Sequence, residues 1–151
     1  MKSVKNLEHN PYLDMLNVSS NNLIDLVNIH KVIGNIRVLS LSKNNIMDLG
    51  DIGKLYSLEK LDLAFNKIPD FSQIQKLSTL PLLTHIVLRG NPIAQYPNYR
   101  TTFFSCFHPR SHEVLVFHPT IIFNPQLTDE FYFFSHDSRY FWMMYQLQPL
   151  N

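Results

Sequence analysis

The sequence of 151 residues lacks the features that mark several common classes of protein. A single cysteine, Cys106, excludes an internal disulfide, so a disulfide-stapled secreted protein is not expected. Glycine is scarce, with four residues, and none of them forms a glycine-rich phosphate-binding loop. No apolar run approaches the roughly 20 residues that span a bilayer, and the first residues lack the apolar segment of a signal peptide. We therefore expect a cytoplasmic protein without membrane insertion.

Charge is sparse and balanced. Lysine and arginine total 13 against 12 acidic residues, and no run of like charge occurs. A protein that binds a phosphate backbone needs a basic stripe, and one that binds a membrane surface needs a polybasic segment. Nucleic acid is therefore not an expected partner. The hydrophobic fraction of 45% is enough for the core of one domain.

An internal repeat predicts the fold. The pattern L-x-x-L-x-L-x-x-N-x-L occurs four times, and its asparagines lie 23, 22 and 25 residues apart, at Asn21, Asn44, Asn66 and Asn91. This period is typical of leucine-rich repeats, which run about 20–29 residues. The alternating apolar positions indicate a short strand in each copy. We therefore predict an α/β leucine-rich repeat solenoid with four parallel concave strands, helical or 3₁₀ convex turns and a C-terminal cap. Stacked copies would align the asparagines in a ladder that satisfies backbone groups in the turns.

The chain divides into three predicted parts. Residues 1–95 form about four coils, residues 96–117 form the cap, and residues 118–151 form an aromatic-rich tail without repeat register. The cap is expected to cover the last coil with Tyr96, Tyr99, Arg100, Phe103, Phe104 and Phe107. Two interpretations of the tail stay open: an aromatic flap on the cap, or a loosely packed end, which we favour.

The solvent-facing strand residues, which we call the concave face, are the candidate binding site. The candidate partner-binding residues are Arg37, Lys43, Glu59, Lys60, Asp62, His85 and Arg89. Their mixed charges, with a few apolar neighbours, suit a protein partner better than nucleic acid. A solvated sheet without a partner is the alternative. Phe65 is either an exposed anchor or, as the sequence favours, a packed turn residue.

No motif for catalysis, a metal or a cofactor is evident. Cys106, His108, His112 and His118 resemble ligands superficially, but zinc sites require four ligands at fixed spacing, and Pro109 interrupts the helix that would align the histidines. Serine, histidine and aspartate occur in no recognised nucleophile motif. We therefore predict a protein that is not an enzyme and has neither a metal site nor a cofactor.

Short segments give a more specific resemblance. Gly34–Ile36, Lys54–Leu58, the block Gly90–Thr101 and Ser111–Val114 resemble the leucine-rich segment of nischarin-like proteins, over about residues 7–117. The resemblance implies a cytosolic, endosome-associated scaffold that binds signalling kinases and Rab or Rac GTPases and affects cell migration. The phosphoinositide-binding domain of that family has no counterpart here, so phosphoinositide binding is not expected. Its integrin-binding region lies beyond the repeats, which makes an integrin tail a doubtful partner.

The same type of coil and cap also resembles a second group of proteins. Phosphatase-regulatory and spliceosomal A-prime-like leucine-rich repeat proteins share both features, and they are our alternative hypothesis. Under either hypothesis, we expect a non-catalytic protein that binds other proteins through the concave face.

Overall fold

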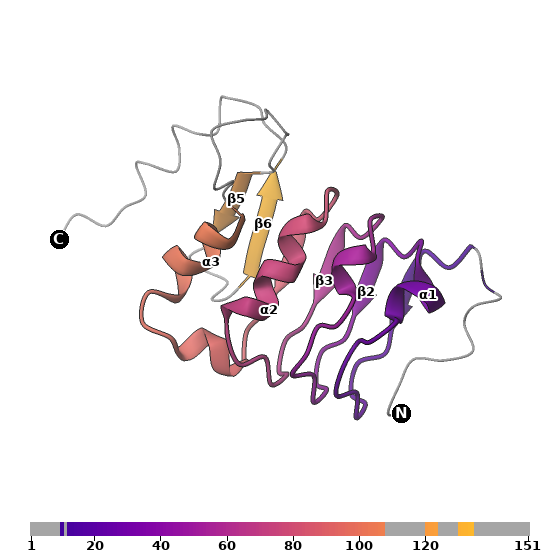
Figure 1. The fold of residues 1–151 in the computed structure, drawn as a ribbon, viewed down its shortest axis with the longest axis horizontal. Coiled ribbons are helices and arrows are strands. Elements are labelled where there is room, and N and C mark those ends of the chain that lie inside the picture. Colours follow the sequence, from indigo (N-terminus) through magenta and orange to yellow (C-terminus); the bar gives the residue numbers. More distant parts are fainter. Residues whose placement is uncertain (1–9, 11, 108–119, 124–129, 135–151) are drawn as a thin grey trace.

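A computed structural model describes residues 10, 12–107, 120–123 and 130–134. The chain winds through stacked coils, each with a short strand and a helical return on the opposite side (Figure 1). The strands of the coils are β1 (Met15–Asn17), β2 (Val38–Ser40), β3 (Lys60–Asp62) and β4 (His85–Val87). They pair in parallel and in register, so that Leu16, Leu39, Leu61 and Ile86 lie side by side. The predicted four parallel strands are confirmed.

The return segments are short helices. They are α1 (Ile29–Ile33), η1 (Ile52–Lys54), α2 (Phe71–Gln75), η2 (Lys76–Thr79) and η3 (Pro92–Gln95), in which η denotes a 3₁₀ helix. The fuller helical return of the third coil, α2 followed by η2, ends before Pro81, because the residue before a proline is disfavoured in a helix. The chain therefore has the α/β architecture that the repeat predicts.

Two further strands extend the sheet. β6 (Glu130–Phe134) pairs antiparallel with β4, and β5 (Thr120–Phe123) pairs antiparallel with β6, giving the order β1-β2-β3-β4-β6-β5. Both strands fall within residues 118–151, whose sequence has no repeat register. Val87, which the strand alternation places among solvent-facing residues, is in fact buried, on a strand flanked by β3 and β6.

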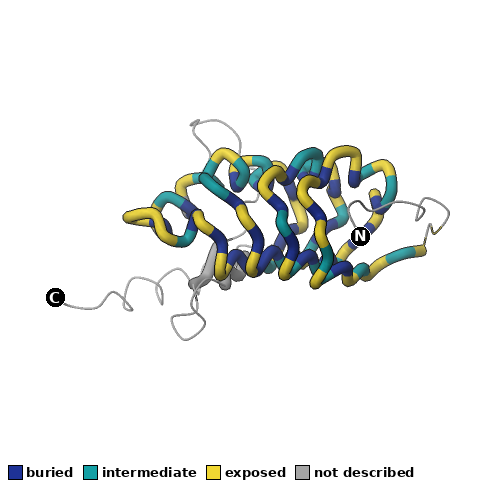
Figure 2. The backbone as a smooth tube through the Cα atoms, turned by 90° about the horizontal axis from the view of Figure 1, so that it is seen from below, coloured by how far each residue is buried: buried dark blue, intermediate teal, exposed yellow. Residues whose placement is uncertain are grey.

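The core runs along the inside of the coils. Because alternate strand residues point to opposite faces, Leu39, Leu61 and Ile86 turn inward, where they meet apolar residues of the returns such as Ile52 and Ile74. Figure 2 shows the buried residues following the inside of one coil after another. In the first coil, Leu13 and Leu16 are only half-buried, since β1 has a described neighbour on one side only.

The helix α3 (Tyr99–Phe107) follows the last coil. Tyr99 and Phe103 are buried, and Phe107 is half-buried against the core. Phe71 joins this aromatic group, with its ring centroid 5.9 Å from those of Tyr99 and Tyr96. Tyr96, which we predicted to cover the last coil, is about half exposed. The side chains of the other two predicted cap residues, Arg100 and Phe104, and the predicted cap residues 108–117, lie outside the described part of the structure.

Three of the four asparagines of the repeat connect neighbouring coils. The side-chain amide of Asn66 donates to the carbonyl of Leu63 in its own coil and to that of Leu41 in the preceding coil, at 3.0 Å each. Its Oδ1 accepts from the amide of Ile46 in the preceding coil at 3.1 Å. Asn44 and Asn91 repeat this arrangement one coil before and one coil after. Within the described part of the chain, Asn21 bonds only in its own coil, to Val18 and Ser19.

The residue before each asparagine has a left-handed backbone. These residues are Ser20, Lys43, Phe65 and Gly90, with φ between 55° and 70°. This conformation costs roughly 1–2 kcal/mol for a residue other than glycine. Hydrogen bonds to the next coil offset this cost, since the amides of Lys43 and Phe65 donate to the carbonyls of Ala64 and Arg89 at 2.8 Å.

We predict that Asn66→Ala destabilises the fold more than Asn21→Ala does. Loss of Asn66 leaves the buried amide of Ile46 without its acceptor, and an unsatisfied buried donor costs about 1–3 kcal/mol. Among the described residues, Asn21 satisfies no amide of another coil, so its loss is expected to cost less than about 1 kcal/mol. Urea unfolding followed by circular dichroism measures both; equal losses would contradict the role of the ladder between coils.

We also predict that the cap helix is required for stability. Phe103 is fully buried, with 0% of its surface exposed, and truncation of a buried aromatic typically costs about 3–5 kcal/mol. Phe103→Ala should therefore lower the free energy of unfolding by this amount. Tyr12→Ala is the control, because Tyr12 is 95% exposed and a surface change costs about 0.5 kcal/mol or less. A loss below about 1 kcal/mol for Phe103→Ala would show that α3 does not close the core.

Candidate protein-binding face

The register of the strands determines which residues of the concave face are neighbours. Lys60 lies beside Val38 on one side and His85 on the other, and Asp62 lies between Ser40 and Val87. Arg37 and Glu59 directly precede β2 and β3. The predicted partner-binding residues therefore come from three adjacent strands and their two ends.

At the start of the strands, an ion-pair network joins three coils. Arg37 donates from Nε and Nη2 to the two carboxylate oxygens of Glu59, at 2.8 and 3.1 Å. Its Nη1 lies 3.6 Å from Oδ2 of Asp14. The hydrogen bond from Arg37 lowers the pKa of Glu59 and raises the pKa of the guanidinium. Two acids thus neutralise one cation at this end of the face.

In the middle of the face, polar side chains are bound to one another. The hydroxyl of Ser40 lies 2.8 Å from that of Ser19 and 3.3 Å from Oδ2 of Asp62. The other oxygen of Asp62 accepts from the amide of Ala64 at 2.9 Å. Asp62 therefore serves the sheet itself, and only part of its hydrogen-bonding capacity is free for a partner.

At the far ends of the strands, the character of the face changes. We call Lys43, Phe65, Arg89 and Gly90 the strand-end rim. Phe65 is 49% exposed, and the guanidinium carbon of Arg89 lies 5.5 Å from the centroid of its ring. Within the described part of the chain, neither Lys43 nor Arg89 forms an ion pair. Phe65 is thus an exposed aromatic residue, in contrast to the packed turn residue that the sequence favours.

The predicted site residues fall into two groups. Arg37 and Glu59 neutralise each other at one end, whereas Lys43 and Arg89 lie at the opposite end, with Lys60 and His85 side by side between them. Three further residues of this face are absent from our list of partner-binding residues: Asp14, which pairs with Arg37, and Ser19 and Ser40, which bond to each other. The sequence signal for Asp14 is its spacing of about one repeat from Arg37, and that for Ser19 is its spacing of about one repeat from Ser40.

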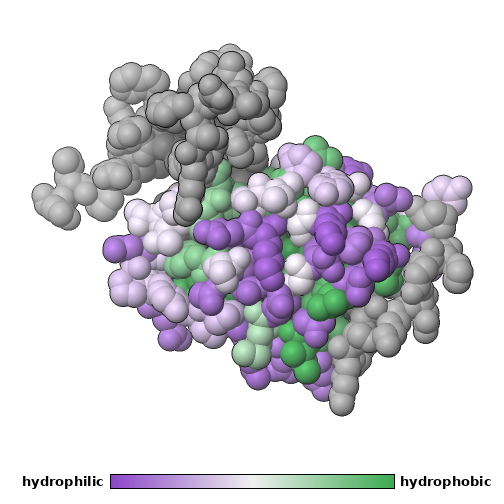
Figure 3. Space-filling model, viewed as in Figure 1, coloured by the Kyte–Doolittle hydropathy of each residue, from purple (hydrophilic) through white to green (hydrophobic). Residues whose placement is uncertain are grey.

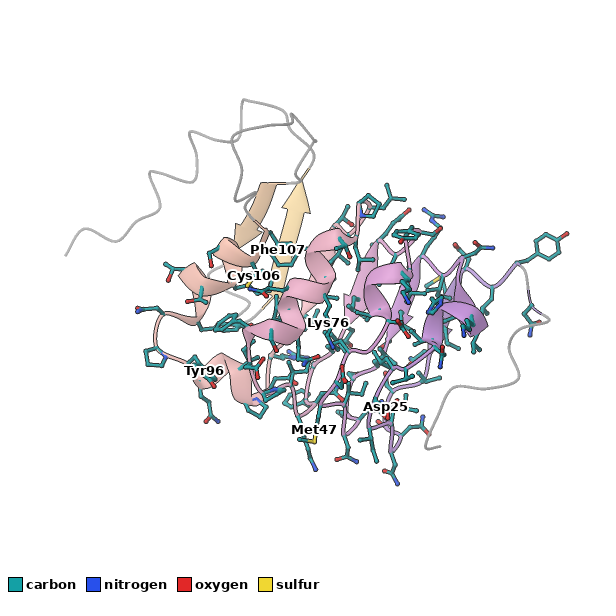
Figure 4. The ribbon with its side chains drawn as sticks, viewed as in Figure 1. Asp25, Met47, Lys76, Tyr96, Cys106 and Phe107 are labelled. Atoms are coloured by element: carbon teal, nitrogen blue, oxygen red, sulfur yellow. The ribbon has the colours of Figure 1, made fainter. Side chains whose placement is uncertain are left out.

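The opposite, helix-bearing face is mostly hydrophilic in Figure 3, with apolar side chains near its lower edge. Met47 is exposed, and so is Ile24, whose carbonyl accepts from the amide of Met47. Figure 4 shows Met47 at this edge and Lys76 higher up, on the helical return. Lys76 donates to Asp48 of the preceding coil at 2.5 Å, and this hydrogen bond lowers the pKa of Asp48. This ion pair joins one coil to the next.

The structure offers no arrangement for a metal among the residues that it describes. No group of three or more histidine, cysteine, aspartate and glutamate side chains comes together there. The thiol of Cys106 donates to the carbonyl of Thr102 at 3.4 Å. His108, His112 and His118, the other superficial ligands, lie outside the described residues. None of the described helices has the length and apolar composition needed to cross a membrane.

This architecture is a leucine-rich repeat fold. Residues 34–77 match the family described as leucine rich repeats, in two copies. The fold is similar to a chain in the crystal structure of the Drosophila melanogaster SNF/U2A' complex, with a TM-score of 0.60 and 23% sequence identity. The similarity covers 71% of this chain and 63% of the Drosophila chain. The present sequence therefore spans less than two thirds of the length of the Drosophila chain. No curated protein matches the sequence.

The finer resemblance to nischarin-like proteins gains no support from these comparisons. They confirm the fold and, over residues 34–77, the type of repeat. The family match covers the second and third coils, including Asn44 and Asn66. The partner-binding residues of the concave face stay a prediction, because neither finding addresses them.

We predict that the Arg37–Glu59 pair makes stability depend on pH in the acid range. The pKa of Glu59 lies below its ordinary value of 4.5, so the pair stabilises the fold above that pH and loses this effect as Glu59 is protonated. Arg37→Gln should therefore show a smaller drop in urea midpoint between neutral and strongly acid pH than the native chain. Lys31→Gln, an exposed change on α1, should keep the native drop; an unchanged drop in Arg37→Gln would contradict the pairing.

Proposed function

We propose that this chain is a non-catalytic protein-interaction module that binds its partner through the concave face. One observation carries the proposal: side chains from three stacked strands lie in fixed register on one face. Strands hold side chains more rigidly than turns do, which favours a preformed binding surface. The hydrogen bond of Arg37 with Glu59 and that of Ser40 with Asp62 add to this rigidity.

The composition of the face favours a protein partner. Exposed Met15 and Phe65, half-buried Val38 and His85, and charges of both signs occur together. Interfaces between proteins combine apolar and polar groups in this way, with aromatic residues, methionine and arginine enriched. A face that binds a nucleic-acid backbone would instead carry a cation at most positions.

For the class of partner, we place the spliceosomal A-prime-like or phosphatase-regulatory hypothesis first. The similarity of fold to a chain of the SNF/U2A' complex supports it, since that chain is found in a complex. Binding of signalling kinases and Rab or Rac GTPases by a nischarin-like scaffold is the second candidate. The observation that favours this candidate is the set of short sequence segments at Gly34–Ile36, Lys54–Leu58 and Gly90–Thr101.

Affinity capture with the intact chain, followed by mass spectrometry of the bound proteins, tests both candidates. Recovery of a ribonucleoprotein component or a phosphatase catalytic subunit supports the first candidate. Recovery of kinases and small GTPases supports the second. The captured partner is then purified, and its affinity for the variants below is measured directly.

We predict that Lys60→Ala weakens binding of that partner by at least about tenfold, because interface energy concentrates in a few central residues. Lys60 is exposed at the centre of the face, and no ion pair within the described residues holds it. Lys31→Ala is the matched control, an exposed lysine on the helix-bearing side. Unchanged affinity for Lys60→Ala together with weaker binding for Lys31→Ala would show that the functional face is the other one.

A further inference from the structure

We infer that the strand-end rim binds an acidic peptide segment of the partner that carries an apolar side chain between its carboxylates. This inference rests on the proposed function, because it identifies the chemistry of the partner at one end of the concave face. The rim consists of Lys43, Phe65, Arg89 and Gly90, and it brings together an exposed aromatic ring and two cations.

Phe65 is held in a conformation that its own side chain does not favour. Its φ is 55°, a region that bulky residues rarely adopt. The ring is not in the core, and about half of its surface faces solvent. Folding therefore gains little from a phenylalanine here, whereas glycine or asparagine would fit the backbone at lower cost. Strained residues of this kind concentrate at binding sites.

Gly90 fixes the position of the ring. A Cβ atom at residue 90 would lie 2.4 Å from Cδ1 of Phe65, so the ring occupies the space that any other residue would fill. Arg89 covers the ring from 5.5 Å. The aromatic surface is thus preformed, with one part against the backbone of the next coil and the rest open to solvent.

Lys43 completes the rim on the other side. It occupies in the second coil the place that Phe65 has in the third, with the same left-handed backbone. Its amide donates to the carbonyl of Ala64 at 2.8 Å, which places its backbone directly beside that of Phe65. Phe65 therefore has a cation in the turn of the coil before it and another in the turn of the coil after it.

The distribution of charge favours an acidic occupant. At the opposite end of the strands Asp14 and Glu59 outnumber Arg37, whereas Lys43 and Arg89 have no ion pair in the described part of the chain. Asp62, three residues before Phe65, is bound to Ser40 and to the amide of Ala64. Carboxylates at the rim would pair with two available cations, and an apolar side chain between them would pack on the open part of the ring.

An aromatic ring between cations also suits single-stranded nucleic acid, on whose bases aromatic residues stack. The observations favour a peptide, because nucleic acid needs a track of cations along its backbone and this face bears Asp14, Glu59 and Asp62 beyond the rim. The two cations of the rim, Lys43 and Arg89, are enough to pair with the few carboxylates of a short acidic peptide.

The test uses the intact chain and a fluorescein-labelled peptide that has one phenylalanine flanked by glutamates on both sides. Fluorescence anisotropy should show binding that weakens with salt and that falls about tenfold or more when the glutamates are replaced by glutamines. Phe65→Asn, which removes the ring but tolerates the left-handed backbone, and the charge reversal Arg89→Glu should each weaken binding about tenfold.

Tyr56→Asn and Lys31→Glu are the matched controls, an exposed aromatic residue and an exposed lysine on the helix-bearing side. Both should bind the peptide as the native chain does. Absence of peptide binding, equal binding by the Phe65→Asn variant, or preferential binding of a labelled oligouridylate would overturn the inference. If the rim fails these tests while Lys60→Ala still weakens the captured partner, the proposed function stands and only the assignment of the rim is wrong.

Discussion

The hydrogen bonds of the buried asparagines are the interaction on which the rest of this structure depends. Three carbonyls just past a strand each accept from two asparagines: that of Val18 from Asn21 and Asn44, that of Leu41 from Asn44 and Asn66, and that of Leu63 from Asn66 and Asn91. A short strand of three residues provides few ladder bonds, so neighbouring coils need this second set of bonds at the turn. The register of the concave face follows from it.

This constraint also explains the strain at the turns. The chain has to turn within two residues between the last strand leucine and the asparagine, and the second of them takes the left-handed conformation in all four coils. Glycine fills this position once, at Gly90. The other three positions are free to vary in side chain, and two of them, Lys43 and Phe65, lie in the strand-end rim. A backbone requirement of the fold thus places the side chains that we propose to bind a partner.

Much of the fold was predictable because the repeat constrains it. The asparagines, the inward leucines and the helix α3 all follow from the apolar pattern and from the need to cover the last coil. The pairing of β6 with β4 was not predictable, because residues 118–151 have no repeat register and antiparallel pairing leaves no periodic signal there. Gln73 and Lys76 look like plain solvent-facing residues in the sequence, yet both bond to the preceding coil, at Leu49 and Asp48.

The candidate site was predictable only in part. Alternation along the strands identifies which residues face solvent, but it does not show which of them neutralise one another. That outcome depends on the reach of side chains across coils, as in the bidentate contact of Arg37 with Glu59. The exposure of Phe65 depends on a backbone conformation that becomes visible only when all four turns are compared, with Gly90 as the sole hint in the sequence.

Native-state hydrogen exchange tests the central claim, that asparagines lock the coils in register. The amides of Ile46 and Ile68 lie outside the strands, and their acceptors are the side chains of Asn66 and Asn91. We predict that both exchange as slowly as the amides of Leu41 and Leu63, which bond between coils through the backbone. Exchange of Ile46 and Ile68 at the rate of exposed amides, with Leu41 and Leu63 still protected, would contradict the account.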